Sequence, residues 1–322
     1  MTESFLAVMI PAFNEEATIE SVVRSIPRSI AGIERVGVFV IDDGSTDQTV
    51  SQAQKAGADR VISLGVHRGL AAAFSRGLDE AMRSGAAWVV NFDADGQYEP
   101  SEISALLEPI RGGRADIVVG NRQVRELDFM PRSKRYGNLF GSWVVRKLSG
   151  IAITDASSGF RAYSREAALR LNIFAQHTYT HESIIDAASK GLRMTEVPCT
   201  FRPTKRPSGE SRLINNIFRH IGQSGLVILR TLILYRPLKI FITTGLIFFL
   251  TAVAIGTRFL YYYVHGAGSG KIQSLLLAAV CAIVGFQIIV MGFLAHATGV
   301  NRRLNEEILY RAKARSIGEG QQ

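Results

Sequence analysis

The first 120 residues alternate short, continuous apolar runs with longer segments of helical periodicity. The apolar runs predict strands at residues 5–10, 36–41, 60–64, 86–92 and 116–120. Helical patterns lie between them, near residues 15–26, 47–56, 70–84 and 101–110, and Ser101 resembles the N-cap of the last of these. Continuous apolar strands are typical of a parallel sheet that is covered by helices on both faces. The pattern therefore predicts an α/β domain.

Polar, charged and glycine residues follow each predicted strand. In chain order these segments are PAFNEE (11–16), DDGSTD (42–47), GVHRG (65–69), DADGQ (93–97) and GNR (120–122). Open α/β sheets bind their ligands at the carboxyl ends of the strands. The sequence therefore predicts a site for a polar, anionic ligand at this edge of the sheet.

The fourth of these segments places two carboxylates one residue apart. In an extended chain, Asp93 and Asp95 point to the same side, and Gln97 adds an amide oxygen. Such hard oxygen ligands suit Mg²⁺ or Mn²⁺, which commonly bridge protein carboxylates to substrate phosphates. The alternative is an acidic turn, but the position beside the other strand-end segments favours a metal. Asp42, at the end of the second strand, is placed to accept hydrogen bonds from a base or ribose.

Two long apolar stretches follow in the last third of the chain. Residues 240–257 and 272–301 contain no Asp, Glu, Lys or Arg. A membrane-spanning helix needs about 20 apolar residues, so the second stretch is long enough, and the first is long enough if Lys239 and Arg258 lie at its ends. The sequence predicts two transmembrane helices, and two buried core helices remain the alternative.

The net charge of +9 is concentrated beside these stretches. The basic residues that precede the first and follow the second are Lys205, Arg206, Arg212, Arg219, Arg230, Arg236, Lys239, Arg302, Arg303, Arg311, Lys313 and Arg315. By the positive-inside rule both termini and the α/β domain are cytoplasmic. The charge indicates membrane anchoring rather than nucleic-acid binding. Residues 213–235 show helical periodicity with interspersed arginines, which predicts an interfacial helix or a packing helix of the domain.

The strand-end segments PAFNEE, DDGSTD and DADGQ, in this order, resemble glycosyltransferase family 2, whose members have the GT-A fold. The later segments SGFRAYSREA (158–167) and EVPCTFRPTKRPSGESRL (196–213) resemble its polyprenyl-phosphate branch, which includes dolichyl-phosphate mannose synthase. Bacterial members of this branch usually carry two C-terminal spans. The resemblance divides the chain into a GT-A domain (1–212), a juxtamembrane helix (213–236), two transmembrane helices within 237–301 (about 238–262 and 272–299) and a basic cytosolic tail (302–322).

The resemblance also implies roles for individual residues. It implies that the nucleotide-sugar is bound by Pro11, Phe13, Glu15, Asp42 and Asp93, and the metal by Asp93, Asp95 and Gln97. The residues implied in catalysis are Asp93, Asp95, Arg122 and Arg135. Those implied near the acceptor phosphate and lipid are Arg135, Asn138, Arg206, Ser211 and Arg212. Glu182 stands where related enzymes with hydroxyl acceptors carry a base, and a helix N-terminal acid explains it equally well.

These features predict an integral protein of the cell inner membrane that transfers a sugar from a UDP- or GDP-sugar to polyprenyl phosphate, with inversion and with Mg²⁺ or Mn²⁺. An acceptor phosphate is already an anion at neutral pH, so it needs no strong base. One alternative is a processive polysaccharide synthase, but neither Trp88 nor Trp143 lies in the Q-x-x-R-W motif of such enzymes. Another is a membrane-tethered nucleotide-sugar sensor without turnover. The two small spans allow a homo-oligomer.

Overall fold

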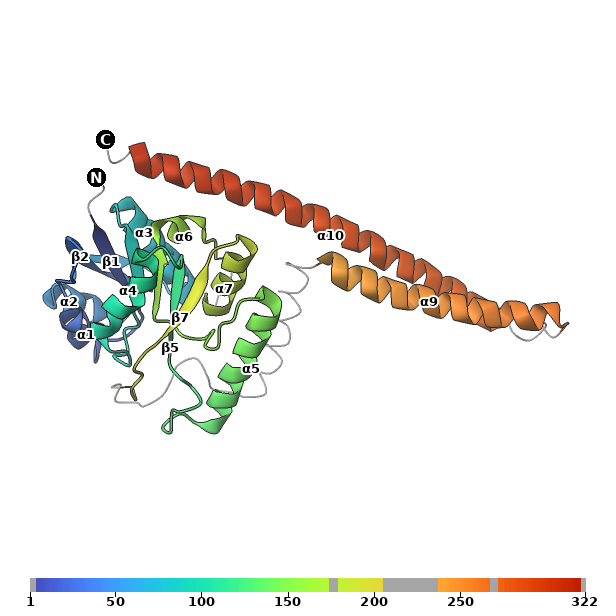
Figure 1. The fold of residues 1–322 in the computed structure, drawn as a ribbon, viewed down its shortest axis with the longest axis horizontal. Coiled ribbons are helices and arrows are strands. Elements are labelled where there is room, and N and C mark those ends of the chain that lie inside the picture. Colours follow the sequence, from blue (N-terminus) through green and yellow to red (C-terminus); the bar gives the residue numbers. More distant parts are fainter. Residues whose placement is uncertain (1–3, 174–178, 205–236, 267–271, 320–322) are drawn as a thin grey trace. The chain divides into compact units, whose positions relative to one another are not determined.

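The computed structural model describes residues 4–173, 179–204, 237–266 and 272–319. The chain forms two compact units (Figure 1). The first comprises Met1–Ile217 and Glu307–Gln322, and the second comprises Phe218–Glu306. The predicted juxtamembrane helix, 213–236, lies outside the described residues.

A seven-stranded sheet forms the centre of the first unit, in the order β3-β2-β1-β4-β6-β5-β7 (Figure 1). The strands are β1 Phe5–Ala12, β2 Arg35–Asp42, β3 Arg60–Ser63, β4 Trp88–Asn91, β5 Ile117–Asn121, β6 Arg161–Ser164 and β7 Met194–Pro198. All neighbouring strands are parallel except β6, which is antiparallel to both β4 and β5. The predicted mostly parallel α/β fold is confirmed.

Strands β1 to β5 coincide with the five predicted apolar runs, whereas β6 and β7 had no such signal. Strand β6 has only four residues and begins with a fully buried arginine, Arg161. Strand β7 has only two neighbouring polar residues between apolar ones, MTEVP, and is half-exposed at the edge of the sheet. Both strands form because hydrogen-bonding partners from distant segments are available, which a local hydrophobic pattern does not record.

Helices cover both faces of the sheet and enclose two hydrophobic clusters. The helices are α1 Ile19–Ser25, α2 Thr49–Lys55, α3 Leu70–Arg83, α4 Ile103–Arg111, α5 Arg132–Ser149, α6 Arg165–Arg170 and α7 Thr180–Ser189. One cluster contains apolar residues of α1 and α4, and the other contains residues of α3, α6 and α7. The prediction that Ser101 caps the fourth helix is wrong. Ser101 lies within a short 3-10 helix, Pro100–Glu102, because proline begins the turn earlier, and α4 starts at Ile103.

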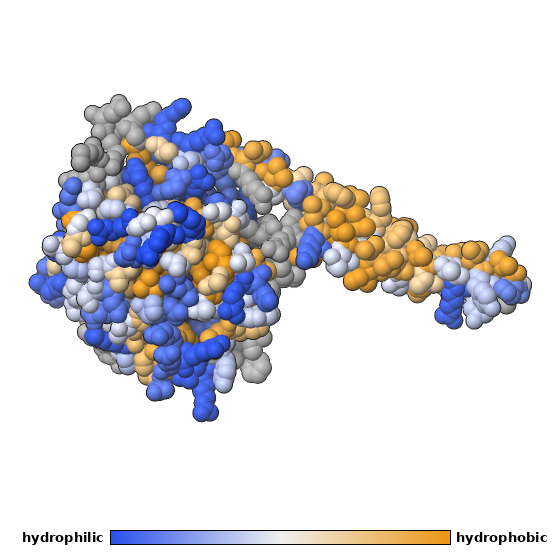
Figure 2. Space-filling view, in the orientation of Figure 1, coloured by the Kyte–Doolittle hydropathy of each residue, from blue (hydrophilic) through white to orange (hydrophobic). Residues whose placement is uncertain are grey.

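The second unit contains helix α9, Pro237–Val264, and most of helix α10, Ile272–Glu319. The candidate spans within them are Leu238–Val264 and Ile272–Ile317, and each contains an 18-residue stretch of high mean hydropathy, 2.2 in the first and 2.5 in the second. Both helices are long and apolar enough to cross a membrane, and few of their side chains are buried by protein. Figure 2 shows their surface as predominantly hydrophobic.

The last turns of α10 belong to the first unit and pack against α3 and α6. The Tyr310 hydroxyl donates to the Glu166 carboxylate at 2.9 Å, and Lys313 pairs with Asp79 at 3.2 Å. Ile317 is buried in the same hydrophobic cluster as α3. Part of the predicted basic tail is therefore an ordered, docked helix.

Candidate active site

The segment after β1 carries three of the predicted nucleotide-binding residues. Pro11 is buried within the strand, and Phe13 and Glu15 follow it. Glu15 is also buried. Its backbone N–H donates to the Thr49 hydroxyl at 2.7 Å, and its carboxylate accepts from Thr18 at 3.1 Å. These contacts tie the segment after β1 to the beginnings of α1 and α2.

Asp42, the last residue of β2, is almost completely buried. One carboxylate oxygen accepts the Ser45 N–H at 2.9 Å, and the other accepts the Ser63 hydroxyl at 2.6 Å. Asp42 thereby shapes the turn after β2 and joins it to β3. Each carboxylate oxygen keeps a second lone pair that could accept from a ligand.

The neighbouring Asp43 holds the loop after β3. It accepts the backbone N–H groups of Arg68 and Gly69, both at 2.8 Å, and it contacts the His67 imidazole at 2.8 Å. The His67 ring stacks on Phe13 with ring centroids 4.1 Å apart. Asp43 and His67 were not predicted as site residues, although the GVHRG segment placed this loop at the correct edge.

The predicted metal-binding residues lie immediately beyond β4. Asp93 and Asp95 are each half-buried. Asp95 accepts the Gln97 N–H at 3.2 Å, and the Gln97 side-chain amide donates to the Arg202 carbonyl at 2.9 Å. In the described part of the chain, no cluster of three or more His, Cys, Asp or Glu residues could hold a metal. Two carboxylates with an amide oxygen suit an ion that takes its remaining ligands from a substrate phosphate and water.

Asp93 rests against the glycine of the SGFR segment. A Cβ atom added at Gly159 would lie 2.4 Å from the Asp93 carboxylate. The Asn91 amide donates to the Gly159 carbonyl at 2.8 Å and contacts the Tyr179 hydroxyl at 2.8 Å. The close approach of Gly159 thus sets where the Asp93 carboxylate can lie.

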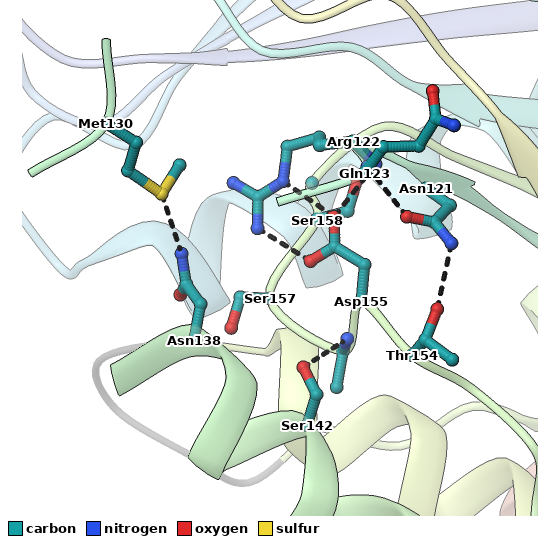
Figure 3. Close-up of polar contacts among 12 residues, drawn as sticks. Asn121, Arg122, Gln123, Met130, Asn138, Ser142, Thr154, Asp155, Ser157 and Ser158 are labelled. Atoms are coloured by element: carbon teal, nitrogen blue, oxygen red, sulfur yellow. Dashed lines mark hydrogen bonds and ion pairs between the residues drawn. The ribbon is translucent and has the colours of Figure 1, made fainter. Parts of the chain in front are cut away.

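Arg122, just beyond β5, forms a buried bidentate pair with Asp155 (Figure 3). Its Nε and Nη2 groups donate to the two carboxylate oxygens at 2.8 and 2.7 Å, and its backbone N–H donates to Asp155 at 3.0 Å. The Arg122 guanidinium also lies 5.2 Å from the centre of the Phe201 ring. Asp155 was not predicted, because it lies outside the recognised SGFR segment, separated from it by two residues, and its partner is distant in sequence.

Arg122 borders a cavity of about 390 Å³. The lining residues come from the 3-10 helix before α4, the segment after β5, and the end of β7 with the residues that follow it: Glu102, Arg122, Gln123, Glu126, Leu127, Pro198, Cys199, Thr200 and Phe201. Burial raises the pKa of the Cys199 thiol to about 12, so the thiol stays protonated and unreactive at neutral pH.

Arg161 at the start of β6 organises the segment that carries both Asp155 and Gly159. Its guanidinium is fully buried and donates to four oxygens: those of Ala156 (backbone), Ser158 (backbone), Thr180 (backbone) and Ser183 (hydroxyl). These bonds fasten residues 156–161 to the beginning of α7. One buried side chain therefore links the Asp93 and Arg122 sides of the site.

Of the residues predicted to lie near the acceptor phosphate, the structure describes Arg135 and Asn138, and both lie on α5. The Arg135 guanidinium donates to the Leu127 carbonyl. The Asn138 amide contacts the Met130 sulfur at 3.8 Å (Figure 3). On the same helix, the Ser142 hydroxyl accepts the Ala156 N–H at 3.0 Å. Helix α5 is thereby tied to the segments that hold Arg122 and Asp155. Arg206, Ser211 and Arg212 lie outside the described residues.

Glu182 lies in the first turn of α7, half-buried, beside His181. The His181 Nε2 atom is 3.1 Å from the Ser157 hydroxyl. Burial lowers the pKa of His181 to about 4, so its imidazole is neutral at pH 7. The first turn of this helix therefore presents one acid and one uncharged imidazole.

The sheet order, the antiparallel β6 and the aspartate pair beyond β4 define a GT-A-type domain of the glycosyltransferase class. Residues 7–171, just over half of the chain, match the sequence model described as glycosyl transferase family 2. The chain belongs to that family and is a glycosyltransferase.

Its similar relatives include transferases that act on polyprenyl phosphates. Polyprenol monophosphomannose synthase of Mycolicibacterium smegmatis is 32% identical over 225 residues, which cover 66% of this chain and 82% of that protein. UDP-N-acetylglucosamine–dolichyl-phosphate N-acetylglucosaminyltransferase of Methanococcus voltae is 31% identical over 219 residues, which cover 62% and 86%.

A solved structure of glucosyl-3-phosphoglycerate synthase from Mycobacterium tuberculosis, in complex with Mn²⁺, UDP and glucosyl-3-phosphoglycerate, is similar to this chain. The TM-score is 0.52 and the sequences are 25% identical. The match covers 70% of this chain and 78% of that one.

Proposed function

We propose that this glycosyltransferase transfers one sugar from a nucleotide-sugar to a polyprenyl phosphate at the cytoplasmic face of the inner membrane, with inversion at the anomeric carbon. The observation that carries the proposal is the convergence of Asp42, Asp93 and Arg122 at one edge of the sheet, in a chain that also has two membrane-length apolar helices. The named relatives support the acceptor class.

The donor is a UDP- or GDP-sugar bound over the ends of β1, β2 and β4. The Phe13–His67 ring pair offers an aromatic surface beside the nucleotide, and the buried Asp42 offers its remaining lone pairs to the base or ribose. Asp43 keeps the loop containing His67 in place. The chain thereby orients the donor before the acceptor arrives, which lowers the entropy cost of reaching the reactive geometry.

Asp93, Asp95 and Gln97 would hold Mg²⁺ or Mn²⁺. When bound, such an ion neutralises the negative charge that develops on the departing nucleoside diphosphate. Neighbouring residues of the chain fix the positions of these side chains. Gly159 positions the Asp93 carboxylate, and the Gln97 amide is oriented by its bond to the Arg202 carbonyl.

Arg122 and Arg135 lie on the acceptor side. The Arg122 fork uses two N–H groups on Asp155 and retains three for phosphate oxygens. Its pairing keeps the guanidinium rigid, so little side-chain entropy is lost when a phosphate binds. The acceptor phosphate is already ionised at neutral pH and attacks directly, so Glu182 is not required as a general base.

Transfer assays with a panel of UDP- and GDP-sugars test this function. The full chain, with Mg²⁺ or Mn²⁺ and a polyprenyl phosphate, is expected to form lipid that carries a single sugar. Chelation of the metal should abolish the product, and added metal should restore it. Formation of polymer would indicate a processive synthase, and nucleotide-sugar binding without turnover would indicate a sensor; either result contradicts the proposal.

Matched variants separate the metal site from the fold. Asp95→Ala should lower metal-dependent transfer by about 100-fold or more, as expected when an electrostatic contact to the transition state is lost. Asp128→Ala removes an exposed carboxylate beyond β5 and should leave transfer unchanged. Full activity of Asp95→Ala would contradict the proposal that Asp95 binds the metal ion.

A further inference from the structure

The half-buried side chain of Glu196, in the edge strand β7, binds the segment that precedes β6. One carboxylate oxygen accepts the backbone N–H groups of Thr154 and Asp155 at 2.7 and 2.8 Å. The other accepts the Thr154 hydroxyl at 2.7 Å and the Asn121 amide at 3.2 Å. A carboxylate has about four lone pairs, and here each of them has a donor. Glu196 therefore ties residues 154 and 155 to the end of β5.

These hydrogen bonds reach Arg122 through Asp155. The backbone of Asp155 is held by Glu196, and the side chain of Asp155 accepts two hydrogen bonds from the Arg122 guanidinium, at 2.8 and 2.7 Å. Successive backbone N–H groups form a concavity that binds an anion, and the Glu196 carboxylate fills this one. The position of the Arg122 guanidinium therefore depends on a carboxylate that Arg122 does not contact.

A second connection runs through Asn121, the last residue of β5. Its amide donates to Glu196 and also to the Thr154 hydroxyl at 2.8 Å, and its side-chain oxygen accepts the Gln123 N–H at 2.8 Å (Figure 3). Gln123 has a φ angle of +52°, a left-handed conformation that is uncommon for a residue other than glycine. Such a conformation persists where the surroundings hold it. Glu196 thus also supports the turn that follows Arg122.

We infer that Glu196 is a positioning residue for the acceptor phosphate. It fixes the backbone of Asp155 and the turn at Gln123, and these two together fix the Arg122 guanidinium in the orientation that meets the phosphate. A ligand-binding side chain whose own partners are locked in place loses little freedom when the ligand arrives. The inference rests on the proposed function, in which Arg122 meets the acceptor phosphate.

The segment before β6 has a different support on the donor side. Arg161 fastens its later residues to α7, close to Gly159, which confines the Asp93 carboxylate. Glu196 holds the earlier residues, at the Arg122 end. Loss of the Glu196 carboxylate should therefore weaken the use of the acceptor and leave the binding of the nucleotide-sugar unchanged. A purely structural role would not separate the two substrates in this way.

The variant Glu196→Gln in the full chain tests this role. The amide has the size of the carboxylate but only one oxygen, so at most two of the four donors keep an acceptor. The KM for polyprenyl phosphate should rise about ten-fold or more, as expected when the support of a ligand-binding side chain is lost. The KM for the nucleotide-sugar should not change. Calorimetry with undecaprenyl phosphate and no sugar donor should show the same loss of affinity.

The outcomes separate this inference from the proposed function. A native chain that transfers no sugar to polyprenyl phosphate contradicts the proposed function. If the native chain does transfer sugar, Glu196→Gln with the native KM and native affinity for the acceptor overturns the inference alone, and so does an equal rise of both KM values. The matched control is Asp116→Asn, since the Asp116 carboxylate accepts the Arg193 N–H at 2.8 Å at the other end of β5 and β7. Its two KM values should be native, and an acceptor KM raised as much as in Glu196→Gln would overturn the inference.

A double variant tests whether Glu196 acts through Arg122. In the Arg122→Ala background, Glu196→Gln should raise the KM for polyprenyl phosphate no further, because the side chain that it positions is absent. Additive effects of the two changes would overturn the inference. If Glu196→Gln does not fold, Thr154→Val takes its place. That change, at an exposed residue, removes the hydroxyl donor and keeps both backbone bonds to Glu196. It should raise the acceptor KM about three-fold, the effect of one hydrogen bond, and a native value would overturn the inference.

Discussion

Asp93 is one of the residues proposed to bind the metal and the nucleotide-sugar. It follows β4 directly, and its carboxylate is confined by the backbone of Gly159 from a segment that lies 66 positions later in the chain. The Asn91 amide and the Tyr179 hydroxyl both donate hydrogen bonds to the Gly159 carbonyl and so fix its position. A metal-binding carboxylate needs this kind of support, since a small displacement changes both the ligand distance and the charge at the diphosphate.

Replacing Gly159 by alanine should displace the Asp93 carboxylate, because the new Cβ atom would lie 2.4 Å from it. We expect a loss of transfer of about 100-fold, the effect of a misplacement near 1 Å in a reactive site. Steady-state transfer rates measure this. The matched variant Gly137→Ala, whose Cβ meets nothing within 4 Å, should keep the native rate. A native rate for Gly159→Ala would show that Asp93 needs no such restraint.

His181 should make the stability of the chain pH-dependent. Burial lowers its pKa from 6.5 to about 4, so between these values the unfolded chain binds more protons than the folded chain. The contribution of His181 is therefore fully present above about pH 6.5 and is lost as the pH falls toward 4. Apparent melting temperatures across this range should fall less steeply for His181→Gln than for the native chain. His265→Gln is the control. If the melting temperature depends on pH in the same way in all three proteins, His181 does not have the lowered pKa in the folded chain.

Among the elements, the segment between α5 and β6 has the widest influence. It carries Asp155, which fixes Arg122, and Gly159, which confines Asp93. Arg161 fastens this segment to α7, because its buried guanidinium donates two hydrogen bonds to the segment and two to the beginning of α7. Because β6 runs antiparallel between β4 and β5, it brings the segment to the edge where these two strands end.

Breaking the buried pair at Asp155 should affect stability and acceptor use together. Asp155→Ala leaves the Arg122 guanidinium buried without its counter-ion, which typically destabilises a protein by about 3–5 kcal/mol. The KM for polyprenyl phosphate should rise more than the KM for the nucleotide-sugar. Thermal unfolding and the two KM values measure these effects.

The double variant Arg122→Ala with Asp155→Ala removes both charges and should recover part of the lost stability without recovering transfer. A destabilisation of the double variant equal to the sum of the destabilisations of Arg122→Ala and Asp155→Ala would show that the pair contributes no net interaction. A double variant that regained full transfer would exclude a role for Arg122 at the acceptor.

At the scale of the whole molecule, two kinds of surface are combined in one chain. The first unit has two hydrophobic clusters enclosed by helices, as in a soluble enzyme. The second unit exposes its apolar side chains along both helices (Figure 2). Apolar surface of that extent is stable only where lipid or protein replaces water, which supports membrane insertion.

The chain should therefore remain in the membrane fraction after carbonate extraction. Ile247 and Leu250 are both exposed in the middle of α9. Replacing both by arginine should release part of the protein from the membrane fraction, since each charge costs about 2.5–3.5 kcal/mol at the centre of a span. Fractionation followed by immunoblotting measures the distribution. The control is Leu304→Arg, which lies beyond the apolar stretch and next to two arginines, and it should leave the distribution between the fractions unchanged. Complete release of the native chain would contradict the predicted spans.

The sequence by itself determined the α/β class, the five parallel strands, the edge at which the site lies and the two apolar helices. These are properties of local hydrophobic pattern and of strand direction, so neighbouring residues suffice to specify them. It also identified Asp93, Asp95 and Arg122 as site candidates, because each follows an apolar strand.

Only the tertiary structure decided what holds those residues. The antiparallel β6, the pairing of Arg122 with Asp155, the contact of Gly159 with Asp93 and the stacking of His67 on Phe13 all join segments that are distant in sequence. The bonds of the Glu196 carboxylate to the backbone of residues 154 and 155 belong to the same group, because the sequence of β7 does not show which N–H groups its side chains meet. Such contacts depend on the packing of the whole sheet, and no local pattern encodes them.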